Sequence, residues 1–277
     1  MPEYYLMRVE REILQERAGE IADWFPEKIT LVELGSGSAS KTRILIEEFL
    51  RRRRSNRTLR YVPVDISRTM LEESSRALLR DYPSLEIIAI AGEYHDCFPR
   101  LFAEAAGAKL VLWLGSNVGN LDRQEAPAFL RLVGQTMSRQ DRLLVGIDLR
   151  KDSAVLQRAY DDSAGVTARF NRNILARINR ELGGHFDLNA FEHQAIYDEK
   201  IGRVEIYLVS ARAQRVAIDH LELEVPFAAG ERVHTENSYK YSIAEIEDLA
   251  AASGLLIQRQ WLDAGHRFSV NLFAPSG

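Results

Sequence analysis

This 277-residue chain has one cysteine and no long apolar stretch. Its one cysteine, Cys97, cannot form an internal disulfide, and no cysteine motif surrounds it. No apolar stretch approaches the roughly 20 residues that a membrane-spanning helix needs. The N-terminus also lacks the charged-then-apolar pattern of a secretory signal. We therefore expect a cytoplasmic protein without a membrane partner.

Positive charge is not in excess either. The chain has 36 Lys and Arg against 40 Asp and Glu, and its formal net charge is -4. This balance argues against a surface that binds nucleic acid. The 6 histidines are scattered, and none is placed at metal-ligand spacing. We therefore expect neither a nucleic-acid partner nor a metal.

A glycine-rich turn between two apolar runs is the most informative feature that is present. Residues 31–38 read LVELGSGS, a helical pattern follows, and a second apolar run ends in Asp65. This pattern predicts a strand, a tight turn, a helix and a second strand with an acid at its tip. Such a unit binds an adenosine cofactor at the carboxyl ends of parallel strands. The glycines let the backbone approach the ligand closely. Asp65 can accept hydrogen bonds from both ribose hydroxyls.

The details of the turn favour one class of cofactor. A pyrophosphate binder usually has G-x-G-x-x-G, whereas here alanine and serine stand where the third glycine would come. Glu33 precedes the first glycine by two positions, and this E-x-G-x-G pattern resembles motif I of the S-adenosylmethionine methyltransferases. A sulfonium cofactor carries no phosphate, so it needs a polar or anionic turn instead of a phosphate cradle.

Strands and helices alternate through the first 150 residues. Such repeated units predict an α/β fold with a doubly wound, mostly parallel Rossmann-like sheet that has helices on both faces. The predicted helices cover 8–24, 40–54, 68–80, 98–106 and 124–137, and the predicted strands cover 29–34, 59–65, 85–91, 109–114 and 143–147.

The pattern changes after Asp148. A polar, mostly helical region over 151–182 breaks at Gly165, and three alternating runs over 190–198, 204–211 and 221–226 are typical of antiparallel strands. A helix over 243–253 and strands over 257–262 and 267–273 then close the first sheet. We predict a cofactor-binding methyltransferase domain and, inserted into it, an α+β substrate-binding domain. The first covers 17–149 and 241–277, and the second covers 1–16 and 150–240.

Several longer motifs point to one family. The run AYDDSAGVTARFNRN at 159–173 has an unusual composition, and PEYYLMRVEREIL, VELGSGSASKTR and ERVHTENSYKY accompany it. On these motifs the chain resembles the histidine-specific Nα-methyltransferases, which convert L-histidine to hercynine in ergothioneine biosynthesis. The resemblance implies an enzyme that takes S-adenosyl-L-methionine, releases S-adenosyl-L-homocysteine and methylates the α-amino group of L-histidine three times.

The resemblance also implies which residues bind the cofactor. Lys41 follows the glycine turn and Asp65 matches the ribose-binding acid. Glu93 and Tyr94 stand beside the adenine, where the family more often has aspartate and phenylalanine. The implied set is Glu33, Gly35, Ser36, Gly37, Lys41, Asp65, Glu93 and Tyr94.

For the substrate, the resemblance implies that Asn120 and Tyr160 bind the α-carboxylate and that Tyr5 lies near the amine. These three are the implied catalytic residues. An amide and a phenol would bind the anion without placing a cation beside the sulfonium. Glu236 and Ser238 would each serve one imidazole nitrogen, and such a buried polar site rejects ligands that leave it unpaired. The other implied contacts are Gly115, Phe170 and Ile206, the last where the family often has methionine.

Other interpretations remain open. Residues 236–238 also suit a turn, and Tyr160 and Phe170 also suit core packing. The substrate could be another amino-acid-like amine, such as a tryptophan derivative, or the chain could be a non-catalytic cofactor-binding partner subunit. The family normally carries several tens of residues before the segment that starts here at Pro2. Without that segment, two arrangements remain open: an active site that is more exposed to water, or one that another segment or subunit covers.

Overall fold

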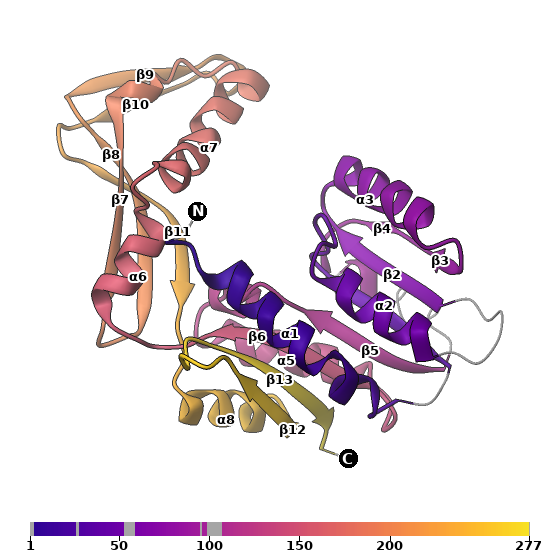
Figure 1. Cartoon of the computed structure of the whole chain (residues 1–277). Helices are drawn as coiled ribbons and strands as arrows, with labels where there is room; N and C mark the ends of the chain where they lie inside the picture. The colour runs from indigo at the N-terminus through magenta and orange to yellow at the C-terminus, as the bar shows by residue number, and fades with distance from the viewer. Residues whose placement is uncertain (1–2, 26–27, 53–58, 95, 99–106, 277) are drawn as a thin grey trace. The chain divides into compact units, whose positions relative to one another are not determined.

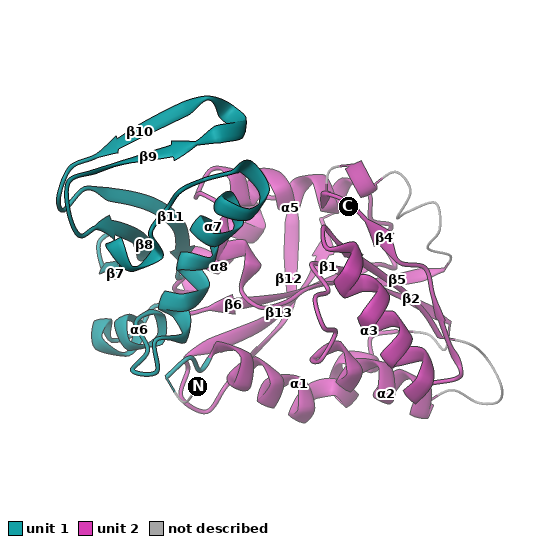
Figure 2. Ribbon diagram, turned by 90° about the horizontal axis from the view of Figure 1, so that it is seen from above, with its two compact units in different colours: residues 1–5, 150–240 teal, residues 6–149, 241–277 magenta. Residues whose placement is uncertain are grey.

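The computed structural model describes residues 3–25, 28–52, 59–94, 96–98 and 107–276. The chain divides into two compact units, distinguished by colour in Figure 2. Unit 1 contains residues 1–5 and 150–240, and unit 2 contains residues 6–149 and 241–277. Residues 6–16, predicted for the substrate-binding domain, belong to unit 2. The reason is that helix α1 (Leu6–Ala22) is continuous and packs against α2 (Thr42–Arg52) and β13 (Phe268–Pro275).

Unit 2 is built on an eight-stranded sheet in the order β12-β13-β6-β5-β1-β2-β3, with β4 also paired to β2. The pairs from β6 to β3 and β4 are parallel, whereas β13 runs antiparallel to both of its neighbours. All six residues of β1 are buried, as expected for a strand covered on both faces. The strands are β1 (Ile29–Leu34), β2 (Leu59–Asp65), β3 (Leu85–Ile87), β4 (Ile90–Ala91), β5 (Ala108–Trp113), β6 (Arg142–Asp148), β12 (Leu255–Leu262) and β13.

Helices cover both faces of this sheet. Figure 2 shows α1, α2 and α3 (Arg68–Asp81) on one face and α5 (Glu125–Gln135) and α8 (Ile243–Ala252) on the other. Helix α8 begins with a capping box, in which Ser242 and Glu245 each accept a hydrogen bond from the other's backbone N–H. The predicted doubly wound, mostly parallel α/β fold is therefore confirmed.

Unit 1 is an α+β unit. It contains a three-stranded antiparallel sheet in the order β11-β8-β7, a hairpin of β9 and β10, and helices α6 (Ser153–Tyr160) and α7 (Val166–Leu182) (Figure 1). The strands are β7 (Phe191–Asp198), β8 (Arg203–Ser210), β9 (Gln214–Ile218), β10 (Leu223–Phe227) and β11 (Arg232–Tyr239).

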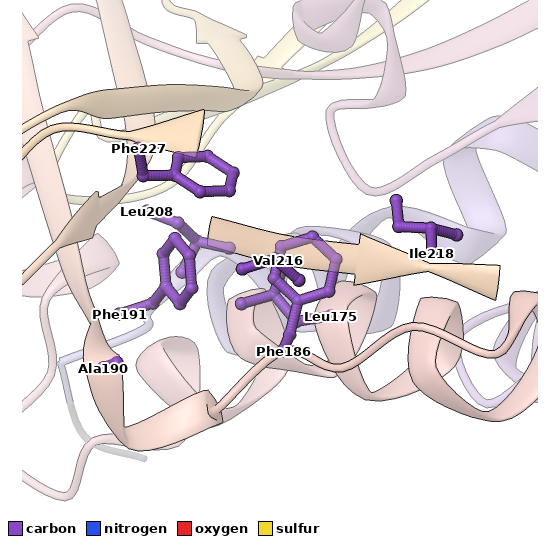
Figure 3. Packing of buried hydrophobic residues seen from close by; sticks show 8 residues of the cluster. All are labelled: Leu175, Phe186, Ala190, Phe191, Leu208, Val216, Ile218 and Phe227. Carbon is purple, nitrogen blue, oxygen red and sulfur yellow. The ribbon is translucent and has the colours of Figure 1, made fainter. Parts of the chain in front are cut away.

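A hydrophobic cluster holds these parts of unit 1 together (Figure 3). Leu175 of α7, Leu208 of β8 and Val216 of β9 belong to this one cluster. The rings of Phe191 and Phe227 pack edge to face with their centroids 5.2 Å apart. Because each element contributes apolar side chains to one cluster, helix α7 is fixed against the sheet and the hairpin. The full cluster is Leu175, Phe186, Ala190, Phe191, Leu208, Val216, Ile218 and Phe227.

One predicted strand differs from the structure, two strands were not predicted, and one predicted helix is not tested. The single strand predicted over 85–91 is two short strands, β3 and β4. Strands β9 and β11 were not predicted, since the first is short and the second is rich in polar residues. The helix predicted over 98–106 lies, beyond Phe98, outside the described residues. No helix in the described part of the chain is long and apolar enough to cross a membrane.

Candidate active site

The glycine turn follows β1 and is tied to the end of the neighbouring strand β2. The backbone N–H groups of Gly35 and Ser36 donate to the Val64 carbonyl, at 2.8 and 3.2 Å. Gly35 has φ 72°, and a Cβ there would lie 2.5 Å from the hydroxyl oxygen of Tyr94. Glycine is therefore required at this position both by the left-handed backbone and by the close approach of Tyr94.

Asp65 ends β2 and is held by the backbone around it. Its Oδ2 accepts from the Gly37 N–H and its Oδ1 accepts from the Ser67 N–H, both at 2.9 Å. A carboxylate has about four acceptor positions, so both oxygens can still accept from a ligand. A cavity of about 370 Å³ lies beside it, lined by Gly35, Asp65, Ile66, Glu93 and Tyr94. The structure thus brings together four residues of the predicted cofactor set.

Glu33 has a different environment from the predicted one. Its side chain is buried, its Oε1 accepts from Thr42 Oγ1 at 2.6 Å, and its Oε2 accepts from the Tyr61 hydroxyl. Burial raises the pKa of the Glu33 carboxyl to about 7, although the two hydroxyl donors oppose the shift. Because both oxygens bind groups of the protein itself, Glu33 connects β1, β2 and α2 beneath the turn and does not line the cavity.

Lys41 and Gly115, predicted for the cofactor and the substrate, meet at a residue that the sequence analysis missed. Glu10 of α1 is fully buried, forms an ion pair with Lys41 and accepts from the Gly115 N–H at 2.8 and 3.0 Å. A Cβ at Gly146 would lie 1.9 Å from Glu10 Oε1, so glycine at that position makes room for the carboxylate. The signal was an acid within the apolar stripe of α1, between Val9 and Ile13.

The residues predicted for histidine are divided between the two units. Gly115 and Asn120 belong to unit 2, and the others belong to unit 1. Asn120 is exposed at the end of the short helix η1 (Asn117–Asn120), which follows β5. Its predicted contact with the α-carboxylate stays a prediction.

A second cavity, of about 280 Å³, lies within unit 1. Its lining includes Tyr160, Phe170, Ile206 and Glu236, all predicted for the substrate, together with Tyr4, Val166 and Thr167. Ile206 and Glu236 are paired across β8 and β11, so their side chains share one face of the sheet. A β-bulge between His234 and Glu236 shifts the register there, and a bulge of this kind re-aims the side chain that follows it.

The chain carries two further polar residues on this side, Ser238 within β11 and Lys240 just beyond its end. Ser238 and Lys240 follow Glu236 at steps of two, the period at which side chains of a strand share a face. Lys240 Nζ donates to Tyr160 Oη at 2.7 Å and to Ser238 Oγ at 2.8 Å, and the two hydroxyl oxygens are 2.9 Å apart. Lys240 was not among the residues predicted from the sequence.

Glu236 is half-buried in a strand, so the alternative interpretation of residues 236–238 as a turn is wrong. Burial raises the pKa of its carboxyl above the ordinary value, and the Lys240 charge opposes this shift. Within the described part of the chain, no group donates a hydrogen bond to the Glu236 carboxylate. Glu236 therefore presents a carboxylate to the cavity with its acceptor positions available to a ligand.

Tyr5 lies differently from its neighbour Tyr4. Tyr5 is buried, its hydroxyl accepts from Lys151, and the Lys151 Nζ is 4.7 Å from the ring centroid. Tyr4 lines the cavity, and its ring meets that of Tyr160 edge to face at 5.9 Å. The N-terminal aromatic wall of the cavity is therefore Tyr4, and the role of Tyr5 near the amine stays a prediction.

The unusual run at 159–173 has a structural explanation. Asp162 accepts from the backbone N–H groups of Val166 and Thr167 at 2.9 and 2.7 Å and so caps helix α7. Burial raises the pKa of this carboxyl, but the hydrogen bonds outweigh it and lower the pKa to about 2. The capped first turn of α7 then places Phe170, which is 73% exposed, at the edge of the cavity.

The sheet order, the glycine turn and Asp65 define the fold of an S-adenosylmethionine-dependent methyltransferase. Two solved structures share it. A methyltransferase from Clostridium acetobutylicum aligns with a TM-score of 0.51 at 11% identity, covering 99% of this chain and 96% of that one. The CcbJ methyltransferase from Streptomyces caelestis aligns with a TM-score of 0.50 at 12% identity, covering 95% of each chain.

Sequence similarity then identifies the family. The family model described as histidine-specific methyltransferase, SAM-dependent, matches residues 1–275, and the chain belongs to this family. The histidine N-alpha-methyltransferases of Mycolicibacterium smegmatis and Mycobacterium tuberculosis are 40% and 42% identical, over 98% and 99% of this chain and 83% and 84% of theirs. An L-tryptophan methyltransferase from Psilocybe serbica is 28% identical over 94% of this chain and 78% of its own length.

Proposed function

We propose that this protein transfers methyl groups from S-adenosyl-L-methionine to the α-amino group of L-histidine, three times in succession, to give hercynine for ergothioneine biosynthesis. The observation that carries the proposal is Glu236, a half-buried carboxylate that lines a cavity beside the Tyr160 and Ser238 hydroxyls. A carboxylate acceptor on β11 with hydroxyl donors from β11 and α6 suits an imidazole, which has one nitrogen of each kind when neutral.

The residues around the first cavity suit the cofactor. S-Adenosyl-L-methionine supplies an electrophilic methyl group bound to a sulfonium. Asp65, oriented by two backbone N–H groups, is the proposed acceptor for the ribose hydroxyls. Ile66 is 75% exposed at the cavity, so an adenine ring would cover apolar surface there. Glu93 and Tyr94 form the rest of this wall.

The proposed roles in unit 1 follow from the hydrogen-bonding capacity of each group. Glu236 accepts from the ring N–H, Ser238 donates to the other ring nitrogen, and Tyr160 donates to the α-carboxylate, with Asn120 and Tyr5 as further proposed contacts. The reaction is an in-line displacement, so the main task of these residues is to hold the amine nitrogen in line. The amine must be neutral to react, and water can accept its proton.

Methyl transfer to L-histidine is the first expected result. Incubated with S-adenosyl-L-methionine, histidine should gain about 14, 28 and 42 mass units, one step per methyl group. Mass spectrometry of the amino acid detects each product. Tryptophan, as the control, should gain nothing measurable. Equal turnover of tryptophan would support the alternative amine substrate, and no turnover of any amino acid would support the non-catalytic partner subunit.

The Asp65→Ala variant tests the cofactor site. We expect S-adenosyl-L-homocysteine to bind about 5- to 150-fold more weakly, because the loss of a charged acceptor for the ribose costs roughly 1–3 kcal/mol. Isothermal titration calorimetry measures this change. Asp81→Ala, which removes an exposed acid paired with Arg43, is the matched control. An unchanged affinity in folded Asp65→Ala would show that Asp65 does not hold the ribose.

A cytoplasmic location and the lack of nucleic-acid and membrane partners stay proposals that rest on composition. Turnover of histidine by the isolated chain would also test whether another segment or subunit is needed to cover the active site.

A further inference from the structure

Lys240 is a fully buried lysine to which the proposed function so far assigns no task. Its backbone N–H donates to the Gly202 carbonyl at 2.8 Å, which anchors it just beyond the end of β11. Its side chain donates to both Tyr160 Oη and Ser238 Oγ and lies 4.6 Å from the centroid of the Tyr160 ring. Burying an amine has a free-energy cost, so its partners should reveal a reason for its position.

The number of hydroxyl hydrogens suggests that reason. A hydroxyl donates one hydrogen and accepts through its lone pairs, whereas a lysine ammonium only donates. If Tyr160 and Ser238 had only each other, one hydrogen would be consumed in the bond between them. In the structure the two hydroxyls are hydrogen-bonded to each other, and Lys240 also donates to each oxygen. When a ligand binds, the two bonds from Lys240 can replace the bond between the hydroxyls, so that both hydroxyl hydrogens turn toward the ligand.

We propose that Lys240 is a positioning residue that makes Tyr160 and Ser238 simultaneous donors to L-histidine. The inference rests on the proposed function, in which the α-carboxylate and one ring nitrogen each need a donor while Glu236 takes the ring N–H. With Lys240 in place, Tyr160 serves the carboxylate and Ser238 serves the ring nitrogen. The site therefore selects a neutral imidazole that has one nitrogen to donate and one to accept.

The inference predicts a loss of selectivity when Lys240 is replaced. Lys240→Met keeps a similar length and apolar stem but donates nothing, so the two hydroxyls must share their hydrogens. We expect kcat/KM for histidine to fall about 30-fold, mainly through KM, since hydrogen bonds to charged or desolvated groups are lost. The affinity for S-adenosyl-L-homocysteine should not change.

Two pyrrolylalanines can be compared with histidine as substrates. The ratio of kcat/KM for histidine to that for a pyrrolylalanine would not change if Lys240 had only a structural role. The 2-yl and 3-yl isomers each keep one ring N–H and replace the other ring nitrogen with C–H, so Ser238 cannot donate to them. In Lys240→Met, the ratio of kcat/KM for histidine to that for the better pyrrolylalanine should fall about tenfold. Lys109→Met is the matched control, because Lys109 is a mostly buried lysine of unit 2 that pairs with Asp141. It should leave the ratio unchanged.

A second measurement covers the case in which Lys240→Met does not fold. Tyr160→Phe and Ser238→Ala each remove one hydroxyl. If each hydrogen serves a separate group of histidine, the two losses in log kcat/KM should add in the double variant. If the hydroxyls share one hydrogen, either single variant still leaves one hydroxyl hydrogen for histidine, so the double variant should lose more than the sum of the two single losses.

These results separate the inference from the function on which it rests. Wild-type protein that does not methylate histidine overturns the proposed function. If wild-type protein is active, an unchanged substrate ratio in folded Lys240→Met overturns the role of Lys240. Where that variant does not fold, non-additive losses at Tyr160 and Ser238 overturn it instead.

Discussion

Replacing Glu236 with alanine is expected to lower kcat/KM for L-histidine by about 30- to 150-fold, with the affinity for S-adenosyl-L-homocysteine nearly intact. The expected loss is about 2–3 kcal/mol, because a charged acceptor is removed from a largely desolvated cavity and the imidazole N–H is left unpaired. Steady-state kinetics with histidine and a cofactor titration measure the two quantities separately.

Two matched variants sharpen this test. Glu236→Gln keeps the shape and one acceptor oxygen, so its loss should be smaller than that of Glu236→Ala. Glu224→Ala removes an exposed glutamate of the same unit, paired with Arg215, and should change kcat/KM by no more than about 0.5 kcal/mol. A Glu236→Ala variant with activity as high as Glu224→Ala would mean that Glu236 does not bind histidine.

The raised pKa of Glu236 adds a pH signature. Because the carboxyl binds a proton more readily than an ordinary glutamate, kcat/KM should fall as the pH decreases through that raised pKa, where the carboxylate loses its charge. Glu236→Gln does not titrate at this position. In a plot of kcat/KM against pH, the Glu236→Gln variant should therefore lack the part of the decrease at low pH that comes from Glu236.

The fold could be predicted from the sequence because its signals are local. Alternating apolar runs and helical patterns in unit 2 reflect strands buried on both faces, and the turn at Gly35 carries its own backbone requirement. Strand β11 could not be predicted from local sequence signals. Its polar residues, such as His234 and Asn237, resemble a turn or loop, and only pairing with β8 makes the segment a strand.

The site could be predicted only in part, for a similar reason. The motif residues Tyr160, Ile206 and Glu236 do line one cavity. Two buried charged residues were not predicted: Glu10, which accepts from Gly115 in unit 2, and Lys240, which donates to Tyr160 in unit 1. Their burial depends on contacts between segments far apart in the chain. Charged residues are mostly exposed in folded proteins, so the sequence alone does not show which of them is buried. A buried charge is identified only when its partners in space are known.

Substituting Glu33 with glutamine is expected to change how stability depends on pH. Burial raises the pKa of Glu33 to about 7 in the folded protein, against 4.5 for the ordinary group. Between these two values the folded state holds a proton that the unfolded state releases. The free energy of unfolding of the wild-type protein must therefore decrease as the pH rises through this window, by an amount on the order of 3 kcal/mol from this group.

The glutamine side chain does not titrate, and its amide can still form hydrogen bonds with the hydroxyls of Thr42 and Tyr61, the two donors to Glu33. Relative to wild-type protein, Glu33→Gln should therefore gain stability steadily from pH 5 to pH 8, most of it below about pH 7. Urea unfolding at several pH values measures the difference. Glu86→Gln, at a half-exposed glutamate paired with Arg60, should run parallel to wild type. If Glu33→Gln also ran parallel, Glu33 would be charged in the folded protein throughout this range, and the hydroxyls of Thr42 and Tyr61 would outweigh its burial.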